Sequence, residues 1–247
     1  MSQTAERAFQ VVEHVARAPA PCALAEVASA SGLDKSTAAR MLAYLERRTL
    51  VQRDLDSKRY SVGPGLVSLA AVVIGGSGLP HAAQPHLERL RDECGETLSL
   101  HVRNGHERVC VAGAESPAVL RRVLTIGEPV ALWTGPTGKT ILAFLPAGEQ
   151  AEVLALARAQ LGDEAAIDAL DAALKALARR GHVVAIGDRT PGVGAVSVPV
   201  YGAGGVVGAV TAAGPAERWT AARMRAFAPR LKQAAREISA KLGGSGP

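Results

Sequence analysis

The feature that most constrains the fold is a pair of short helical segments joined by a glycine-containing turn near the N-terminus. Residues 24–30 predict one helix, which stops at Gly32 because glycine readily adopts the left-handed conformation that ends a helix. A second helix is predicted to begin near Asp34, with Asp34 or Ser36 as its cap. Its inward face carries apolar residues at helical spacing: Ala38, Met41, Leu42 and Leu45. This arrangement is typical of a helix-turn-helix.

The flanking segments extend the motif to a winged helix-turn-helix. An apolar stripe within residues 8–15 predicts a preceding helix, which the prolines in 18–21 bring to an end. Residues 50–62 hold two short β-type runs around Asp56 and Ser57, as in a hairpin. The alternative is a three-helix packing unit with an ordinary solvated face. The hairpin directly behind the helices favours the winged motif.

A winged helix-turn-helix predicts double-stranded operator DNA as the partner, with the second helix in the major groove. The candidate groove contacts on the outward side of that helix are Lys35, Ser36, Thr37, Arg40 and Tyr44. The candidate wing contacts are Arg53, Lys58 and Arg59. The first 60 residues carry nine Lys and Arg against seven Asp and Glu, without a dense basic block. DNA binding therefore depends on a few well-placed cations.

Composition and cysteine usage narrow the class of protein. The three cysteines, Cys22, Cys94 and Cys110, are far apart and odd in number, so reduced thiols are expected rather than a disulfide framework. The longest nearly pure apolar run covers 14 residues, 66–79, whereas a membrane span needs about 20. Neither a metal-ligand spacing nor a G-x-S-x-G nucleophile motif is present. We therefore expect a soluble cytoplasmic protein that is not an enzyme and needs no metal or cofactor.

The rest of the chain predicts an α+β layer structure, because strands come in pairs with helices set between the pairs. Glycine-rich breaks at 63–65 and 75–78 separate three parts. We expect a DNA-binding domain over 1–63, a linker helix over 64–81 and a second domain over 82–247.

The order of features resembles the IclR family of transcriptional regulators. The resemblance is carried by the segments 33–42 and 45–48, then 138–146, 180–182, 191–200 and 214–215, and it covers nearly the whole chain. It implies a winged helix-turn-helix, a linker helix and a C-terminal GAF-like effector-binding domain with an antiparallel sheet flanked by helices. It also implies a homodimer or homotetramer that activates or represses transcription according to a small metabolite.

The loop 133–140 has a second interpretation as a phosphate-binding loop of an enzyme. It follows an apolar strand, precedes a helix and ends Gly-Lys-Thr, as a P-loop does. However, Trp133 stands where glycine is needed and Pro136 lacks an amide, so part of the phosphate cradle is missing. A nucleotide-binding enzyme that uses residues 135–140 is therefore the minor alternative. A helix that begins near Thr137 still favours a carboxylate at its N-terminus, unless Thr134 or Thr137 simply caps it.

The family resemblance also implies an effector site, in which a carboxylate is held by amides before the Gly138-Lys139 helix and by side chains of later strands. Those strand positions fall here on Ala185, Ala195, Thr211 and Ala213. The remaining candidates are Cys110, Val111, Leu124, Leu132, Trp133, Thr137 and Gly138. Three alanines predict a larger and less polar pocket, which suits a partly apolar carboxylic acid or amide, aromatic or branched, with its polar end near Thr137. A register error of one or two residues would make the lining polar instead.

The apolar run 66–74 predicts self-association. It is apolar on all sides of a helix, so one domain face cannot cover it completely. Pairing with a second copy would cover the remainder and present two recognition helices to a palindromic site. The alternative is burial under the C-terminal domain.

Overall fold

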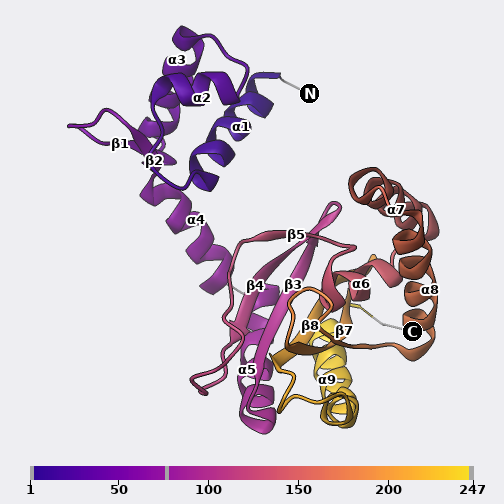
Figure 1. Ribbon diagram of the computed structural model, residues 1–247. Coiled ribbons are helices and arrows are strands. Elements are labelled where there is room, and N and C mark those ends of the chain that lie inside the picture. Colours follow the sequence, from indigo (N-terminus) through magenta and orange to yellow (C-terminus); the bar gives the residue numbers. More distant parts are fainter. Residues whose placement is uncertain (1–2, 76–77, 245–247) are drawn as a thin grey trace. The chain divides into compact units, whose positions relative to one another are not determined.

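Three helices and a two-stranded hairpin form the first part of the computed structural model, which describes residues 3–75 and 78–244 (Figure 1). The helices are α1 (Gln3–Arg17), α2 (Leu24–Ala30) and α3 (Lys35–Arg47). The hairpin strands β1 (Val51–Arg53) and β2 (Tyr60–Val62) follow, and then α4 (Pro64–Gly75). The chain divides into two units, Met1–Gly76 and Ser77–Pro247.

The N-terminal unit is held together by one apolar core to which α1, α2, α3 and both hairpin strands contribute. Its buried side chains are Val11, Val15, Cys22, Val27, Leu42, Leu45, Val51 and Tyr60. The backbone of Cys22 exchanges two hydrogen bonds of 2.8 Å with Tyr60, which ties the segment before α2 to the hairpin. The predicted helices and the hairpin are therefore confirmed.

A six-stranded antiparallel sheet forms the centre of the C-terminal unit, in the order β5-β4-β3-β8-β7-β6. Its strands are β3 (Thr97–Asn104), β4 (Glu107–Ala114), β5 (Pro129–Ala131), β6 (Val183–Ile186), β7 (Val193–Gly202) and β8 (Gly205–Pro215). The helices are α5 (Leu79–Cys94), α6 (Gly135–Ala143), α7 (Ala147–Leu161), α8 (Glu164–Arg180) and α9 (Ala221–Lys241). The predicted α+β fold with an antiparallel sheet flanked by helices is confirmed.

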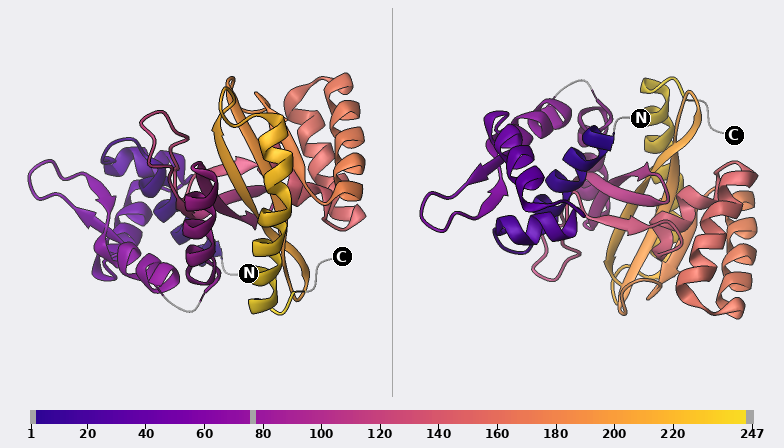
Figure 2. Two further views of the ribbon diagram at one scale, coloured as in Figure 1. Left: turned by 90° about the horizontal axis from the view of Figure 1, so that it is seen from below. Right: turned by 90° about the horizontal axis from the view of Figure 1, so that it is seen from above.

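The helices cover the two faces of this sheet in separate layers (Figure 2). On one face α5 and α9 bury residues such as Leu87, Leu231 and Ile238 against strand residues that include Leu98 and Val198. On the other face α6 packs against β6, β7 and β8 and is covered in turn by α7 and α8. This second layer covers one end of the sheet and leaves room beside α6 for a cavity.

The segment predicted as one linker helix over 64–81 contains parts of two helices. α4 ends at Gly75, and α5 begins at Leu79 with Gly78 at its N-cap position. Pro80 lies in the first turn of α5. Proline has no backbone N–H, which costs no hydrogen bond here because the N–H groups of the first turn have no acceptor within the helix. The described part of the structure leaves out residues 76–77 and the side chains of residues 71–75. These residues belong to the predicted linker and to the predicted association surface.

Candidate functional sites

The outward face of α3 presents most of the predicted groove contacts to solvent. Lys35, Arg40 and Tyr44 are exposed, and Thr37 is partly buried. Asp34 caps the helix, because its carboxylate accepts hydrogen bonds of 2.9 Å from the backbone amides of Ser36 and Thr37. The Ser36 hydroxyl also donates to Asp34 at 2.7 Å. These hydrogen bonds hold the pKa of Asp34 well below its usual range, so the carboxylate stays charged.

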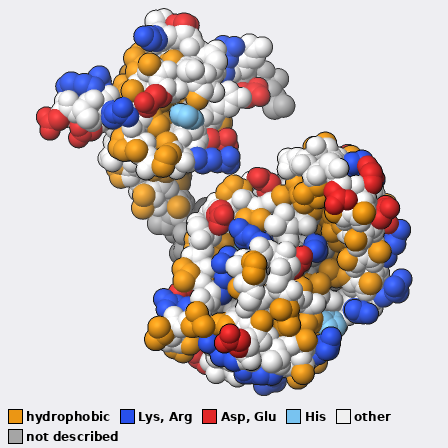
Figure 3. All heavy atoms as spheres, in the orientation of Figure 1, with side chains coloured by type: hydrophobic (Ala, Val, Ile, Leu, Met, Phe, Trp, Pro, Cys, Tyr) orange, Lys and Arg blue, Asp and Glu red, His pale blue; other side chains and the backbone are white. Residues whose placement is uncertain are grey.

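The predicted wing contacts have different surroundings. The Arg59 guanidinium donates to the Pro21 carbonyl at 2.7 Å and lies 3.4 Å from the Glu26 carboxylate, so it joins the wing to α2. Arg53 lies over the Tyr60 ring, and the Lys58 ammonium donates to a carbonyl within the hairpin. Figure 3 shows basic and acidic side chains side by side on this hairpin. Lys35 and Arg40 are exposed on α3, and their contact with DNA stays a prediction.

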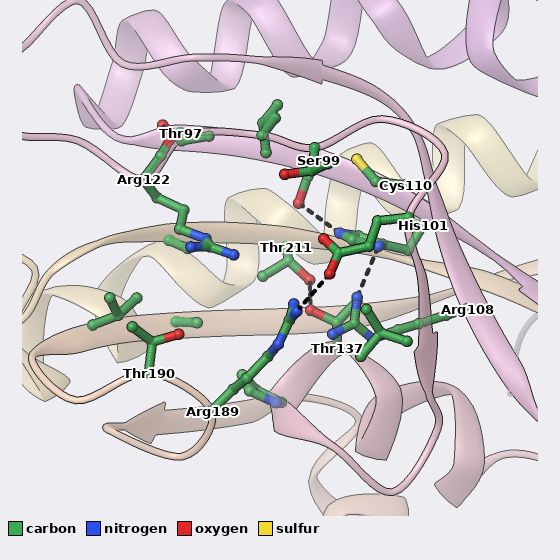
Figure 4. Close-up of a pocket in the computed structure, with 18 of the residues that line it drawn as sticks. Thr97, Ser99, His101, Arg108, Cys110, Arg122, Thr137, Arg189, Thr190 and Thr211 are labelled. Carbon is green, nitrogen blue, oxygen red and sulfur yellow. Dashed lines mark hydrogen bonds and ion pairs between the residues drawn. The ribbon is translucent and has the colours of Figure 1, made fainter. Parts of the chain in front are cut away.

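A cavity in the C-terminal unit lies between the sheet, the start of α6 and two loops, 115–128 and 187–192 (Figure 4). Seven of the predicted effector residues line it: Cys110, Leu124, Thr137, Ala185, Ala195, Thr211 and Ala213. Ala185, Ala195 and Ala213 are directly paired across β6, β7 and β8, so their methyl groups form a row on the sheet. The sequence positions predicted to converge therefore do lie together.

Two predicted effector residues lie outside this cavity because of the core beside α6. Leu132 is fully buried there, and Trp133 packs against the same cluster. These residues contribute to packing under α7 and α8 rather than to the cavity lining.

Val111 and Gly138 are also absent from the cavity lining. Leu100 pairs with Ala112 and His101 with Cys110, which leaves Val111 as the extra residue of a β-bulge. Cys110 thus lines the cavity, whereas Val111 packs against the α5 and α9 core. A Cβ at Gly138 would collide with the Leu132 carbonyl, so this glycine allows α6 to approach the backbone closely.

The sequence interpretation missed the ionisable part of the lining, which comprises His101, Arg108, Arg122, Glu128, Asp188 and Arg189. Figure 4 shows Arg108, Arg122 and Arg189 reaching toward the same space from β4 and from the two loops. The pocket is therefore more polar than the three alanines suggested. Arg108 was detectable as the charged residue directly before the apolar run Val109-Cys110-Val111.

Arg108 is a buried cation held by a neutral histidine. Its guanidinium donates to Nδ1 of His101 at 2.9 Å, and the opposite ring nitrogen lies 3.2 Å from the Ser99 hydroxyl. Burial, and after it the charge of Arg108, lowers the pKa of His101 to about 3, so the ring is neutral near pH 7. Arg108 is only 3% exposed, and its Nε has no hydrogen-bond partner among the described residues. Burial also lowers the pKa of Arg108 to about 10, which leaves it charged.

The floor of the cavity is a chain of hydroxyl groups. The Thr137 and Thr211 hydroxyls are 2.9 Å apart, and Thr211 donates to Ser197 at 2.9 Å. Neither of the threonines considered as caps serves α6: Thr134 at the N-cap position makes no side-chain capping bond, and Thr137 bonds across to β8. Cys110 is buried, which raises the pKa of its thiol to about 11, so it contributes an unreactive lining group.

Lys139, the lysine of the P-loop-like segment 133–140, forms an ion pair within the C-terminal unit. Nζ of Lys139 lies 2.6 Å from the Asp188 carboxylate, which ties α6 to the loop after β6. This ion pair neutralises the cation that a phosphate-binding loop would direct at a nucleotide. The described residues contain no group of three or more His, Cys, Asp or Glu able to hold a metal ion. None of their helices is long and apolar enough to cross a membrane.

Two family models match this chain. The model for the IclR helix-turn-helix domain matches residues 4–55, and the model for the bacterial transcriptional regulator IclR C-terminal domain matches residues 71–240. The chain belongs to the IclR family of transcriptional regulators. As a member of the IclR family, it is a DNA-binding regulator of transcription, in agreement with the resemblance seen in the sequence.

Relatives along the full length support this assignment. The "Probable transcriptional regulator SauR" of Cupriavidus necator is 31% identical over 238 residues, which cover 95% of this chain and 94% of that protein. The HTH-type transcriptional repressor AllR of Salmonella typhi is 25% identical over 246 residues, which cover 98% and 90%. The structure of an IclR transcriptional regulator from Alicyclobacillus acidocaldarius has the same fold, with a TM-score of 0.84, 23% identity and coverage of 98% and 100%. These IclR-family relatives are regulators rather than enzymes, and they give the nucleotide-binding alternative no support.

Proposed function

We propose that this regulator releases or engages its operator according to a small carboxylic acid bound in the cavity beside α6. The observation that carries the proposal is the buried guanidinium of Arg108, which has no carboxylate partner among the described residues. Burying an unpaired charge is costly, so a protein that keeps one gains from a ligand of opposite charge. A neutral amide would leave that charge uncompensated, which favours the acid over the amide.

The apolar part of the effector would lie against the alanine row of Ala185, Ala195 and Ala213, with a carboxylate near Thr137 and Arg108. The cavity has a volume of about 90 Å³. An apolar cavity that admits benzene has roughly 150 Å³. These volumes favour a branched acid of a few carbons over an aromatic one.

A thermal-shift comparison of acids with their own amides tests the proposal. Isobutyrate and benzoate would be compared with isobutyramide and benzamide. Glyoxylate and pyruvate would represent the two-carbon and the three-carbon oxoacids, respectively. At a concentration 100 times Kd a ligand adds about 2.7 kcal/mol to the free energy of unfolding, which raises Tm by several degrees. We expect isobutyrate to raise Tm and both amides to leave it unchanged. Equal shifts with acid and amide would contradict the proposal, and shifts with the oxoacids alone would contradict the alanine-row argument.

A further inference from the structure

The charges that line the cavity do not balance. Three arginines face it, Arg108, Arg122 and Arg189, together with Glu128 and Asp188. Arg189 pairs with Glu128 at 3.4 Å, and Asp188 pairs at 2.6 Å with Lys139 from outside the lining. Among the described residues, no carboxylate lies within ion-pair distance of Arg108 or Arg122. Two positive charges are thus left without a partner in one small space.

The backbone at Arg122 is held in place by hydrogen bonds on both sides of this residue. Its backbone carbonyl accepts a hydrogen bond of 2.7 Å from the Thr97 hydroxyl on β3, and the same hydroxyl accepts one from the Ser116 amide. Two residues further on, the Leu124 amide donates to the Glu115 carboxylate at 3.0 Å. These bonds fix the loop 115–128 at both sides of Arg122, whose guanidinium points into the cavity in Figure 4.

The two unpaired arginines reach the cavity from different segments, with the alanine row beside them. Arg108 comes from β4 and is oriented by His101, whereas Arg122 comes from the loop that follows β4. An arginine fork binds a carboxylate through two parallel hydrogen bonds, so each fork can hold one acid group. A monocarboxylate would satisfy one of the two and leave the other unpaired.

We propose that the effector is a small dianion, with one acid group bound by Arg108 and a second bound by Arg122, and with its carbon skeleton against the alanine row. This inference rests on the proposed function, since it concerns the same cavity. It goes beyond that function by fixing the charge of the ligand and by giving the two arginines separate roles.

Matched pairs of acids test the inference by isothermal titration calorimetry. Methylmalonate differs from isobutyrate by a carboxylate in place of one methyl group, and malonate differs from propionate in the same way. We expect the dianion of at least one pair to bind 10-fold or more tightly than its monoanion. Arg122→Gln should bring that ratio close to one, whereas Arg108→Met should abolish binding of both members. Arg225→Gln, a change of an exposed arginine on α9, should leave all affinities unchanged.

The outcomes separate the inference from the proposed function. If both members of each pair bind equally well and Arg122→Gln lowers neither affinity selectively, the dianion is wrong while the acid-binding cavity stands. If no acid binds, or if Arg108→Met leaves binding intact, the proposed effector site is wrong as well. Circular dichroism of each variant would establish that it is folded before its affinity is compared.

Discussion

The two candidate sites of this molecule are built in opposite ways. The α3 face takes its cations from one helix, and Lys35 and Arg40 are exposed to water. The cavity collects its cations from a strand and two loops, and it buries one of them so that Arg108 is only 3% exposed. Exposed cations suit a polyanion that is bound and released in a salt-dependent way. A buried, unpaired cation suits a small anion that enters and replaces water.

The largest expected effect concerns self-association, on which the α3 face depends if the operator is palindromic. Val67 and Leu69 on α4 are 65% and 59% exposed, as expected of a helix that pairs with a second copy. We predict that Val67→Asp combined with Leu69→Asp converts a dimer to a monomer in light scattering at micromolar concentration. Loss of bivalent binding should lower operator affinity roughly 100-fold or more.

Leu161→Asp is the matched control, because Leu161 is a half-exposed leucine on α7. It should leave both the mass and the operator affinity unchanged. A wild-type protein that is already monomeric at this concentration would rule out the paired α4 helices.

The second-largest expected effect compares two arginines of the N-terminal unit: Arg40, which is exposed, and Arg59, which bonds to other residues. Arg40→Ala should weaken operator binding by roughly 1–3 kcal/mol, because we expect the exposed Arg40 side chain to contact a base edge. Arg59→Ala should weaken operator binding less, because the Arg59 guanidinium already donates to the Pro21 carbonyl and pairs with the Glu26 carboxylate. Fluorescence anisotropy with a DNA fragment that co-purifies with the protein measures both. An Arg40→Ala variant that binds like wild type would remove α3 from the interface.

The pH dependence of folding tests the neutral state of His101. The pKa of His101 is about 3 in the folded chain and about 6.5 when unfolded, so between these values the unfolded chain binds more protons. The free energy of unfolding should therefore fall as the pH falls below 6.5, by about 1–2 kcal/mol from this ring between pH 7 and pH 5. In urea unfolding, the free energy of unfolding of His101→Gln should fall less than that of the wild type between pH 7 and pH 5. For His106→Gln, at an exposed position, it should fall as much as for the wild type. Identical pH profiles for all three proteins would contradict a partly buried neutral ring at His101.

The smallest expected effect is an increase in the stability of the ligand-free protein. Arg108→Met removes a buried, unpaired charge while keeping a side chain of similar length, so we expect the ligand-free protein to become more stable by about 1 kcal/mol. Urea unfolding in a buffer without carboxylic acids measures this change. A loss of more than 2 kcal/mol would mean that Arg108 is needed for the fold, and the cavity would then lose its strongest argument.

The same contrast explains how far the sequence alone could lead. The α3 face was predictable because Gly32, Asp34 and the apolar stripe act within a few residues of each other. The alanine row was predictable in position only through the family resemblance. The orientation of Arg122 and Arg189 was not, because it depends on bonds between distant segments, such as Thr97 to the Arg122 carbonyl. The bulge at Val111 likewise depends on the pairing of β3 with β4.

The central claim, that DNA binding and effector binding lie in separate sets of residues, is tested most directly by comparing Arg40→Ala with Arg108→Met. Each variant would be assayed for operator affinity by anisotropy and for the rise in Tm with isobutyrate and methylmalonate. The account predicts that Arg40→Ala loses operator affinity and keeps the wild-type rise in Tm, whereas Arg108→Met keeps operator affinity and loses the rise. Either variant losing both properties while remaining folded would contradict it.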